Sequence, residues 1–352
     1  MEAAPRVKMA DVAARAGVSV ATVSKVVNGR YGVAKETVEL VQGVIEEMGY
    51  AGNLSASSLR MQQTNVLGIL VASFEPFSAE LLKGAAAAAE GSGYELLAHS
   101  GGDNHGWERR SLARLGGTLI AGAVLVTPTV LDARTVVPVV AIDPHYGPNR
   151  LPTIDADSFT GAEQATEHLI SLGHRRIAFL GGRSELDSAH LREAGYRNAM
   201  AEAGIPVDQA LVRETRYVPD RAAEVTRELL MMKDRPTAIF AANDITAMRA
   251  MDVAHEFGLA VPEDLSIVGF DDVPEASLAT PSLTTVRQPM QSMGAAAMTM
   301  LLDLINGVER EPHVRMATEL VVRGTTTEPP VELVTAVEPA LVVPAARGAV
   351  DA

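Results

Sequence analysis

Short apolar runs alternate with amphipathic helical segments from Val66 onward, and this alternation limits the possible folds more than any other feature. The pattern is typical of βαβ units, in which helices cover a sheet of parallel strands. The expected strands are 66–72, 95–100, 123–126, 137–143, 176–181, 238–241 and 265–270. The expected helices are 79–92, 106–115, 159–172, 190–203, 222–232, 244–257 and 290–306. Two comparable α/β series follow one another, so we predict two lobes that bind ligands outside the carboxyl ends of their strands.

The chain of 352 residues is too long for one hydrophobic core. Three further segments differ from the α/β region in composition and periodicity. Residues 8–50 have short helical patterns, whereas residues 51–64 are small, polar and rich in serine. Residues 329–352 are rich in Pro, Ala and Val without periodicity, which predicts a mostly disordered tail. The sequence contains no cysteine, no apolar signal-peptide core and no apolar run of about 18 residues that could span a membrane. These features favour a soluble protein of the cytoplasm.

The charge of the chain is unevenly distributed. The net charge is −14, which alone argues against a nucleic-acid partner. Residues 1–35, however, contain six basic and two acidic side chains, a local charge of +4 that leaves −18 for the rest of the chain. A basic N-terminal segment followed by an acidic remainder is expected when one small module contacts phosphate and the rest of the chain does not.

Residues 9–29 predict two short helices joined by a tight turn. We expect a helix over 11–16, a turn at Gly17, and a second helix over 20–28 that Ser19 caps. A third helix follows. The apolar residues expected in the core of this unit are Val12, Ala13, Val23, Val27, Val38, Val41, Val44, Ile45 and Met48. A core of this size predicts a headpiece that is marginally stable by itself.

The second of these helices has the residues to read DNA. In a helix-turn-helix this helix enters the major groove with its N-terminal residues facing the base edges. Val20 and Ala21 can touch a thymine methyl group, and Lys25 can address O6 and N7 of guanine. Phosphate contacts are expected from Thr22, Ser24 and Asn28. The alternative at this point is a small helical bundle without a role in DNA binding.

The pattern at residues 11–29, Asp-Val-Ala-x-x-Ala-Gly-Val-Ser-x-x-Thr-Val-Ser-x-Val-x-Asn-Gly, resembles the LacI/GalR repressor family. The family ends its headpiece with Gly-Tyr-x-Pro-Asn and a hinge helix, where this chain has Gly-Tyr-Ala-Gly-Asn at 49–53. The resemblance implies DNA contacts by Asn53 and Leu59, with Leu59 entering the minor groove. Gly52 replaces the usual proline, so we expect a hinge that is helical only on DNA. A flexible linker is the alternative.

The body resembles the same family over about residues 64–328 through motifs such as Leu-Gly-His-Arg-Arg-Ile-Ala-Phe-Leu-Gly-Gly from Leu172. The resemblance implies an all-α helix-turn-helix headpiece and an α/β sensor of two lobes, similar to periplasmic sugar-binding proteins. The expected parts are the headpiece at 1–50, the hinge at 51–64, the sensor at 65–328 and the tail at 329–352. Within the sensor we expect an N-terminal lobe of 65–156 and 287–316, and a C-terminal lobe of 157–286 and 317–328.

Polar side chains at the predicted strand ends indicate where an effector binds. Asp271 and Asn243 follow strands, and Arg192 lies near the start of a helix after the strand at 176–181. A carboxylate, an amide and a guanidinium suit vicinal hydroxyl groups, and the family motifs imply ligand contacts at the same three positions. Phe77 and Asp143 are weaker candidates from the N-terminal lobe.

Each candidate also has a structural interpretation. Asp271 could belong to a turn after its strand, and Arg192 could form a surface ion pair. Asn243 and Asp244 could cap a helix, a role we assign to Asp244. Phe77 could lie in the core, which is also the place expected for Trp107.

The sequence does not favour an enzyme or a cofactor. It has no nucleophile elbow, no Walker-type loop and no histidine spacing typical of a metal site. We expect a homodimer that binds an inverted-repeat operator, represses carbohydrate-utilisation genes and leaves the DNA when a small sugar-type effector binds. The alternatives are a sugar-binding module without a role in gene control and an enzyme that acts on its ligand. The sequence also leaves open a nucleobase as effector and corepression instead of induction.

Overall fold

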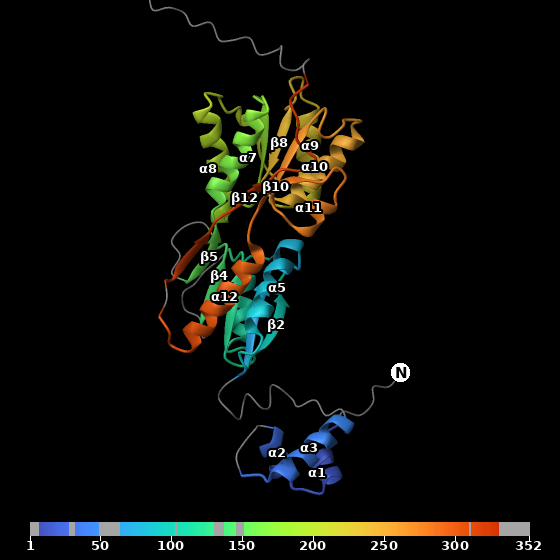
Figure 1. The fold of residues 1–352 in the computed structure, drawn as a ribbon, viewed down its shortest axis with the longest axis vertical. Coiled ribbons are helices and arrows are strands. Elements are labelled where there is room, and N and C mark those ends of the chain that lie inside the picture. The colour runs from blue at the N-terminus through green and yellow to red at the C-terminus, as the bar shows by residue number, and fades with distance from the viewer. Residues whose placement is uncertain are drawn as a thin grey trace, which may run out of the picture.

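The computed structural model describes residues 7–27, 32–48, 64–102, 104–129, 137–145, 151–309 and 311–330. The first part is a unit of three helices, α1 (Met9–Ala16), α2 (Val20–Val27) and α3 (Lys35–Met48), as Figure 1 shows. Its buried core consists of Val12, Ala13, Ala16, Val23, Val41 and Val44. The expectation for Val27 was wrong, because Val26 packs against this core and Val27 is exposed.

The turn between α1 and α2 follows from two residues. Gly17 has a φ of 66°, a left-handed conformation that ends α1. Ser19 Oγ accepts a hydrogen bond from the backbone N–H of Thr22 at 3.0 Å. The predicted cap at the start of α2 is therefore confirmed.

The remaining chain forms two six-stranded sheets that define two lobes (Figure 1). The sheet of the N-terminal lobe is entirely parallel, and its strands in spatial order are β11 (His313–Met316), β5 (Thr153–Ala156), β4 (Val139–Ile142), β3 (Gly122–Val126), β1 (Val66–Val71) and β2 (Glu95–Ser100). The helices of this lobe are α5 (Pro76–Ala89), α6 (Trp107–Leu115) and α12 (Met290–Ile305). Helix α5 packs along α12, and Trp107 is buried in the core, as predicted.

The sheet of the C-terminal lobe is parallel except for one edge strand. Its strands in spatial order are β12 (Glu319–Val321), β10 (Thr284–Arg287), β9 (Ser266–Asp271), β8 (Ala238–Ala241), β6 (Ile177–Gly181) and β7 (Val212–Glu214). Strand β12 runs antiparallel to β10. The helices are α7 (Ser158–Ser171), α8 (Asp187–Glu202), α9 (Pro219–Leu230), α10 (Asp244–Glu256) and α11 (Pro274–Leu278).

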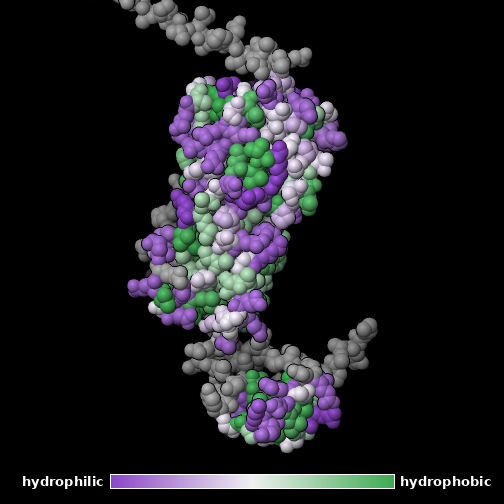
Figure 2. Space-filling view, viewed as in Figure 1, coloured by the Kyte–Doolittle hydropathy of each residue, from purple (hydrophilic) through white to green (hydrophobic). Residues whose placement is uncertain are grey.

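The chain crosses between the lobes three times, after β5, after β10 and after β11. Neither lobe is therefore one continuous segment. Figure 2 shows hydrophilic and hydrophobic residues mixed on the viewed face of the two lobes, with a compact hydrophobic patch near the middle of the upper lobe. Within the described residues, no helix has the length and hydropathy needed to cross a membrane.

The predicted elements differ from the observed ones mainly at their ends. Helix α5 starts at Pro76 and not at residue 79, because Glu75 and Ser78 form a reciprocal capping box before it. Strand β9 extends to Asp271, one residue beyond the prediction. The short strands β5, β7, β10, β11 and β12 were not predicted from the sequence.

Candidate effector cavity and DNA-reading helix

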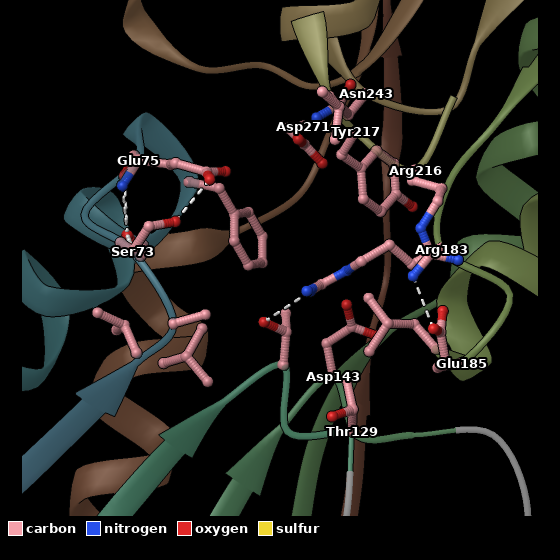
Figure 3. A pocket seen from close by; sticks show the side chains of 18 of the residues that line it. Ser73, Glu75, Thr129, Asp143, Arg183, Glu185, Arg216, Tyr217, Asn243 and Asp271 are labelled. Carbon is pink, nitrogen blue, oxygen red and sulfur yellow. Dashed lines mark hydrogen bonds and ion pairs between the residues drawn. The ribbon is translucent and has the colours of Figure 1, made fainter. Parts of the chain in front are cut away.

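A cavity of about 450 Å³ lies between the two lobes, at the carboxyl ends of both sheets. Figure 3 shows Asp271 and Asn243 reaching it from one lobe and Asp143 and Thr129 from the other. We call it the effector cavity. The structure brings all five residues predicted to bind the effector into its lining, namely Phe77, Asp143, Arg192, Asn243 and Asp271.

Asp271 is the last residue of β9 and is almost completely buried in the floor of the cavity. Its Oδ1 accepts a hydrogen bond from Gln288 Nε2 at 2.6 Å and lies 3.6 Å from Arg192 Nη1. Burial raises the pKa of Asp271 to about 7, although Arg192 and Gln288 act in the opposite direction. The carboxyl group is thus poised to change its ionisation near neutral pH.

Arg192 projects from α8 into the same floor and is 3% exposed. Its Nη1 donates to the carbonyl of Ala242, and its guanidinium carbon lies 3.8 Å from the centroid of the Phe270 ring. Its Nε is buried and has no hydrogen-bond partner within the described part of the chain. The alternative of a surface ion pair was wrong, because Arg192 is buried beside the equally buried Asp271.

Asn243 both caps α10 and lines the cavity. Its Oδ1 accepts a hydrogen bond from the backbone N–H of Thr246 at 2.9 Å, so Asn243, and not Asp244, is the N-cap. The cap assigned to Asp244 was wrong. Asp244 is buried below the cavity, where it accepts hydrogen bonds from Thr285 Oγ1 and from the backbone N–H of Val273. Burial and the neighbouring Asp271 raise its pKa.

The N-terminal lobe contributes Asp143 and Phe77. Asp143 follows β4 with a φ of 49°, and burial raises its pKa. Its Oδ2 accepts a hydrogen bond from Ser188 Oγ of the other lobe at 3.0 Å. Phe77 is half-buried and combines both roles considered for it, because it packs against the core of its lobe and also lines the cavity.

Arg183 and Tyr217 also line the cavity, although neither was predicted from the sequence (Figure 3). Arg183 Nη2 donates to Thr127 Oγ1 of the other lobe at 3.3 Å. Arg183 Nε and the Tyr217 hydroxyl are buried without a hydrogen-bond partner among the described residues. Arg183 comes two residues after β6, so the rule that polar residues just after a predicted strand line the ligand site also applies to it. The same rule could not identify Tyr217, because β7 before it was not predicted.

The lobes also touch directly at one rim of the cavity. The backbone N–H of Asp187 donates to the carbonyl of Pro144 at 3.2 Å, and a β-bridge joins His145 to Leu186. Together with the bond between Ser188 and Asp143, these contacts join the two lobes along this rim. In the described ranges, no group of three or more acidic or histidine side chains is placed to hold a metal ion.

Helix α2 presents the residues predicted to face DNA bases. Val20 is 48% exposed, an unusual position for a β-branched apolar side chain, and Ala21 and Lys25 are exposed as well. Thr22 and Ser24 are half-buried, and Thr22 Oγ1 lies 2.9 Å from Ser19 Oγ. The predicted DNA contacts Asn28, Asn53 and Leu59 lie outside the described residues.

Two family descriptions match the chain. Residues 8–53 match the bacterial regulatory proteins of the lacI family, and residues 166–326 match a periplasmic binding protein-like domain. The first match covers all three helices of the N-terminal unit, and the second covers most of the C-terminal lobe.

Similar proteins are found among curated sequences and solved structures. The HTH-type transcriptional repressor PurR of Pectobacterium carotovorum subsp. carotovorum (strain PC1) is 35% identical over 314 residues, which are 86% of this chain and 92% of that repressor. The Lac repressor dimer bound to operator and the anti-inducer ONPF is 29% identical, with a TM-score of 0.76 over 92% of this chain and 100% of that one. The complex of the transcriptional regulator CelR with cellobiose is 32% identical, with a TM-score of 0.68 over 91% of this chain and 100% of that one.

These relatives are repressors and regulators of transcription and not enzymes. They share with this chain both the helix-turn-helix unit and the two-lobed α/β domain, which confirms the predicted fold class. The chain belongs to the lacI family of DNA-binding transcriptional regulators.

Proposed function

We propose that this protein represses carbohydrate-utilisation genes and leaves its operator when a small sugar binds in the effector cavity. The observation that carries this proposal is the mixture of donors and acceptors in the cavity. Asp143 and Asp271 are acceptors when ionised, and Arg183, Arg192 and Tyr217 each have a buried polar atom that finds no hydrogen-bond partner among the residues the structure describes. A sugar has hydroxyl groups that both donate and accept, so it satisfies such a set. The CelR structure, solved with cellobiose, supports this class of effector.

A nucleobase is the second candidate, and the aromatic residues of the cavity favour it. Phe77 and Tyr217 both line the cavity, from different lobes, and aromatic rings bind flat heterocycles by stacking. A nucleobase would leave more of the polar atoms unpaired than a sugar with hydroxyl groups on every side. We therefore propose a sugar, and not a nucleobase, as the first candidate for the effector.

We infer that α2 reads the operator. The side chains of Val20, Ala21 and Lys25 are exposed on one short helix, as base contacts require. Thr22, Ser24 and Asn28 are proposed phosphate contacts, and Asn53 and Leu59 are proposed contacts near the centre of the operator. We also propose a cytoplasmic location, because operator DNA lies there in a bacterium.

We propose that the protein is a homodimer whose two headpieces read an inverted repeat. The Lac repressor relative was solved as a dimer on its operator. Sedimentation of the intact chain at micromolar concentration distinguishes a dimer from a monomer or a tetramer.

A thermal-shift screen followed by a gel shift tests the proposed function. The screen compares monosaccharides, disaccharides such as cellobiose, and purine bases at millimolar concentration. A ligand that binds the folded state raises the melting temperature by mass action. A hit that then releases the protein from a palindromic operator supports induction by that class. Stabilisation by purines alone, or tighter operator binding with the hit, would contradict the proposal of a sugar inducer.

A further inference from the structure

Helices α5 and α12 pack so closely that they form one unit, which we call the helix pair. Gly84 of α5 lies against the backbone carbonyl of Gln291, and Gly294 of α12 lies against that of Leu81. A Cβ atom at either glycine would overlap with the opposite backbone. Gln291 Nε2 also donates to Glu80 Oε2 at 2.8 Å. Helices in backbone contact cannot slide past each other without repacking, so the pair moves as one body.

The helix pair reaches the effector cavity at the start of both helices. Glu75, Phe77 and Ser78, at the N-terminal end of α5, line the cavity directly. At the start of α12, Gln288 reaches the cavity floor through two hydrogen bonds to Asp271. Its Nε2 donates to Oδ1 at 2.6 Å, and its backbone N–H donates to the Asp271 carbonyl at 3.2 Å. The pair is thus attached to both walls of the cavity.

Gln288 lies where the chain leaves the C-terminal lobe. It directly follows β10, and α12 of the N-terminal lobe begins two residues later. Gln288 is buried and is not among the residues that line the cavity, so its contact is with Asp271 and not with a ligand. A displacement of Asp271 is therefore transferred to the segment that connects the lobes.

The backbone of Asp271 explains why such a partner is needed. Its φ of 119° lies in a region that residues with a side chain rarely adopt. A conformation of this kind persists only when the surrounding contacts fix it. Gln288 supplies two of these contacts, one to the backbone and one to the carboxylate.

We propose that Gln288 is a positioning residue that couples the effector cavity to the helix pair. It fixes Asp271 for the effector and transmits any movement of Asp271 to α12 and, through the contacts at Gly84 and Gly294, to α5. The proposal rests on the proposed function in one respect, since it gives Asp271 the role of an effector contact. The headpiece joins the N-terminal lobe just before β1, so a rotation of this lobe changes the position from which the headpiece is held.

The test uses the full chain without sugar or operator, so its outcome is independent of the effector's identity. Gln288→Met keeps the approximate length of the side chain and removes its amide, including the N–H group that donates to Asp271. The control is Ser292→Ala, at an exposed position of the same helix. One measurement is the titration of the Asp271 carboxyl carbon by NMR. The other is the distance between spin labels at Ala86→Cys and Lys233→Cys, both exposed and in different lobes, in a chain that has no native cysteine.

We expect Gln288→Met to move the Asp271 titration to higher pH, because the lost hydrogen bond stabilises the ionised form. We also expect a shifted or broader distribution of distances between the lobes, with neither change in Ser292→Ala. A changed titration with an unchanged distance overturns the coupling, and an unchanged titration overturns the positioning. If Gln288→Met does not fold, Gln288→Asn, whose amide is one methylene short of Asp271, is measured in its place. Loss of the effector response in the thermal-shift screen has no bearing on either measurement.

Discussion

Ser188 of α8 donates a hydrogen bond to Asp143, across the gap between the two lobes, at 3.0 Å. Asp143 follows β4 of the N-terminal lobe, and Ser188 lies in the first turn of α8 of the C-terminal lobe. The bond is part of a rim of direct contacts that closes the effector cavity on one side. It is one of several contacts between the lobes, and its hydroxyl group can be removed by a single substitution.

The substitution Ser188→Ala is expected to weaken effector binding about fivefold, which corresponds to roughly 1 kcal/mol for one hydrogen bond. The variant favours the open arrangement, so the effector must supply more of the free energy of closure. Titration calorimetry with the sugar found in the screen measures this change. Ser184→Ala, at an exposed position before the same helix, is the control. Equal affinities of the two variants would show that the bond does not stabilise closure.

Asp271→Ala is expected to abolish the effector response and to leave operator binding unchanged within about twofold. The substitution removes the carboxylate acceptor and leaves the buried Arg192 without its charge partner, 3.6 Å away. Gel shifts with and without the sugar measure the response, and calorimetry measures its binding. Asp252→Ala changes an exposed carboxylate on α10 and serves as the control. A normal response of the Asp271 variant would remove Asp271 from the effector site.

The stability of the protein is expected to depend on the ionisation of Asp271. Its pKa is about 7 in the folded protein and 3.8 ordinarily, so between these values the folded state binds more protons than the unfolded state. The free energy of unfolding therefore falls as the pH rises from about 4 to 7 through this group. Urea denaturation at pH 5, 6, 7 and 8 should show a weaker fall in Asp271→Asn. An unchanged profile in this variant would mean that Asp271 is already ionised at pH 5.

The ionisation of His174 is expected to change the free energy of unfolding with pH in the opposite direction to that of Asp271, over an overlapping pH range. Its ring is buried between Thr237 Oγ1 and the carbonyl of Thr327, and burial lowers its pKa from 6.5 to about 4. Its contribution to stability is complete above pH 6.5 and is lost as the pH falls towards 4. His174→Gln should therefore destabilise the protein at pH 7 and flatten its loss of stability below pH 6.5. His190→Gln, on the exposed face of α8, should keep the original profile.

An exchange of Val20 and Ala21 is expected to change which operator sequence is preferred. Apolar side chains discriminate by contact with the thymine methyl group, and the exchange moves the larger one by one position. The charge of the headpiece stays the same, so the dependence of affinity on salt should not change. Selection from a randomised operator library measures the preference, and gel shifts at several salt concentrations measure the slope. An unchanged preference would argue against base contacts at these two positions.

The sequence predicts the cavity well where apolar strands mark its edge. The runs at 137–143, 238–241 and 265–270 are easily recognised, and the polar residues that follow or end them, Asp143, Asn243 and Asp271, meet in one place. Tyr217 was missed because β7 before it is a three-residue strand at the edge of the sheet without an apolar run. Short edge strands depend on their neighbours more than on their own sequence.

Two further predictions, for Val27 in the core and for Asp244 as a helix cap, were wrong by one residue. Val27 and Val26 fit the pattern of α2 almost equally well, and only the packing of α1 and α3 decides that Val26 contacts the core. Asn243 and Asp244 are both good caps, and the exact start of α10 decides between them. The bond between Gln288 and Asp271 has no signal in the sequence at all, because the crossover after β10 creates it.

The three crossings between the lobes also determine the order in which the protein can fold on the ribosome. The sheet of the N-terminal lobe needs β11, and its core needs α12, so it stays incomplete until residue 316 has emerged. By residue 287, the C-terminal lobe lacks only the edge strand β12 among its described elements, whereas the N-terminal lobe still lacks both β11 and the core helix α12. The part made later can therefore approach its final structure first, which reverses the usual order of domain folding during synthesis. Nascent chains between these two lengths expose the face of α5 that α12 later covers. We expect chaperones to bind the nascent chain most at this stage, because exposed apolar surface promotes aggregation.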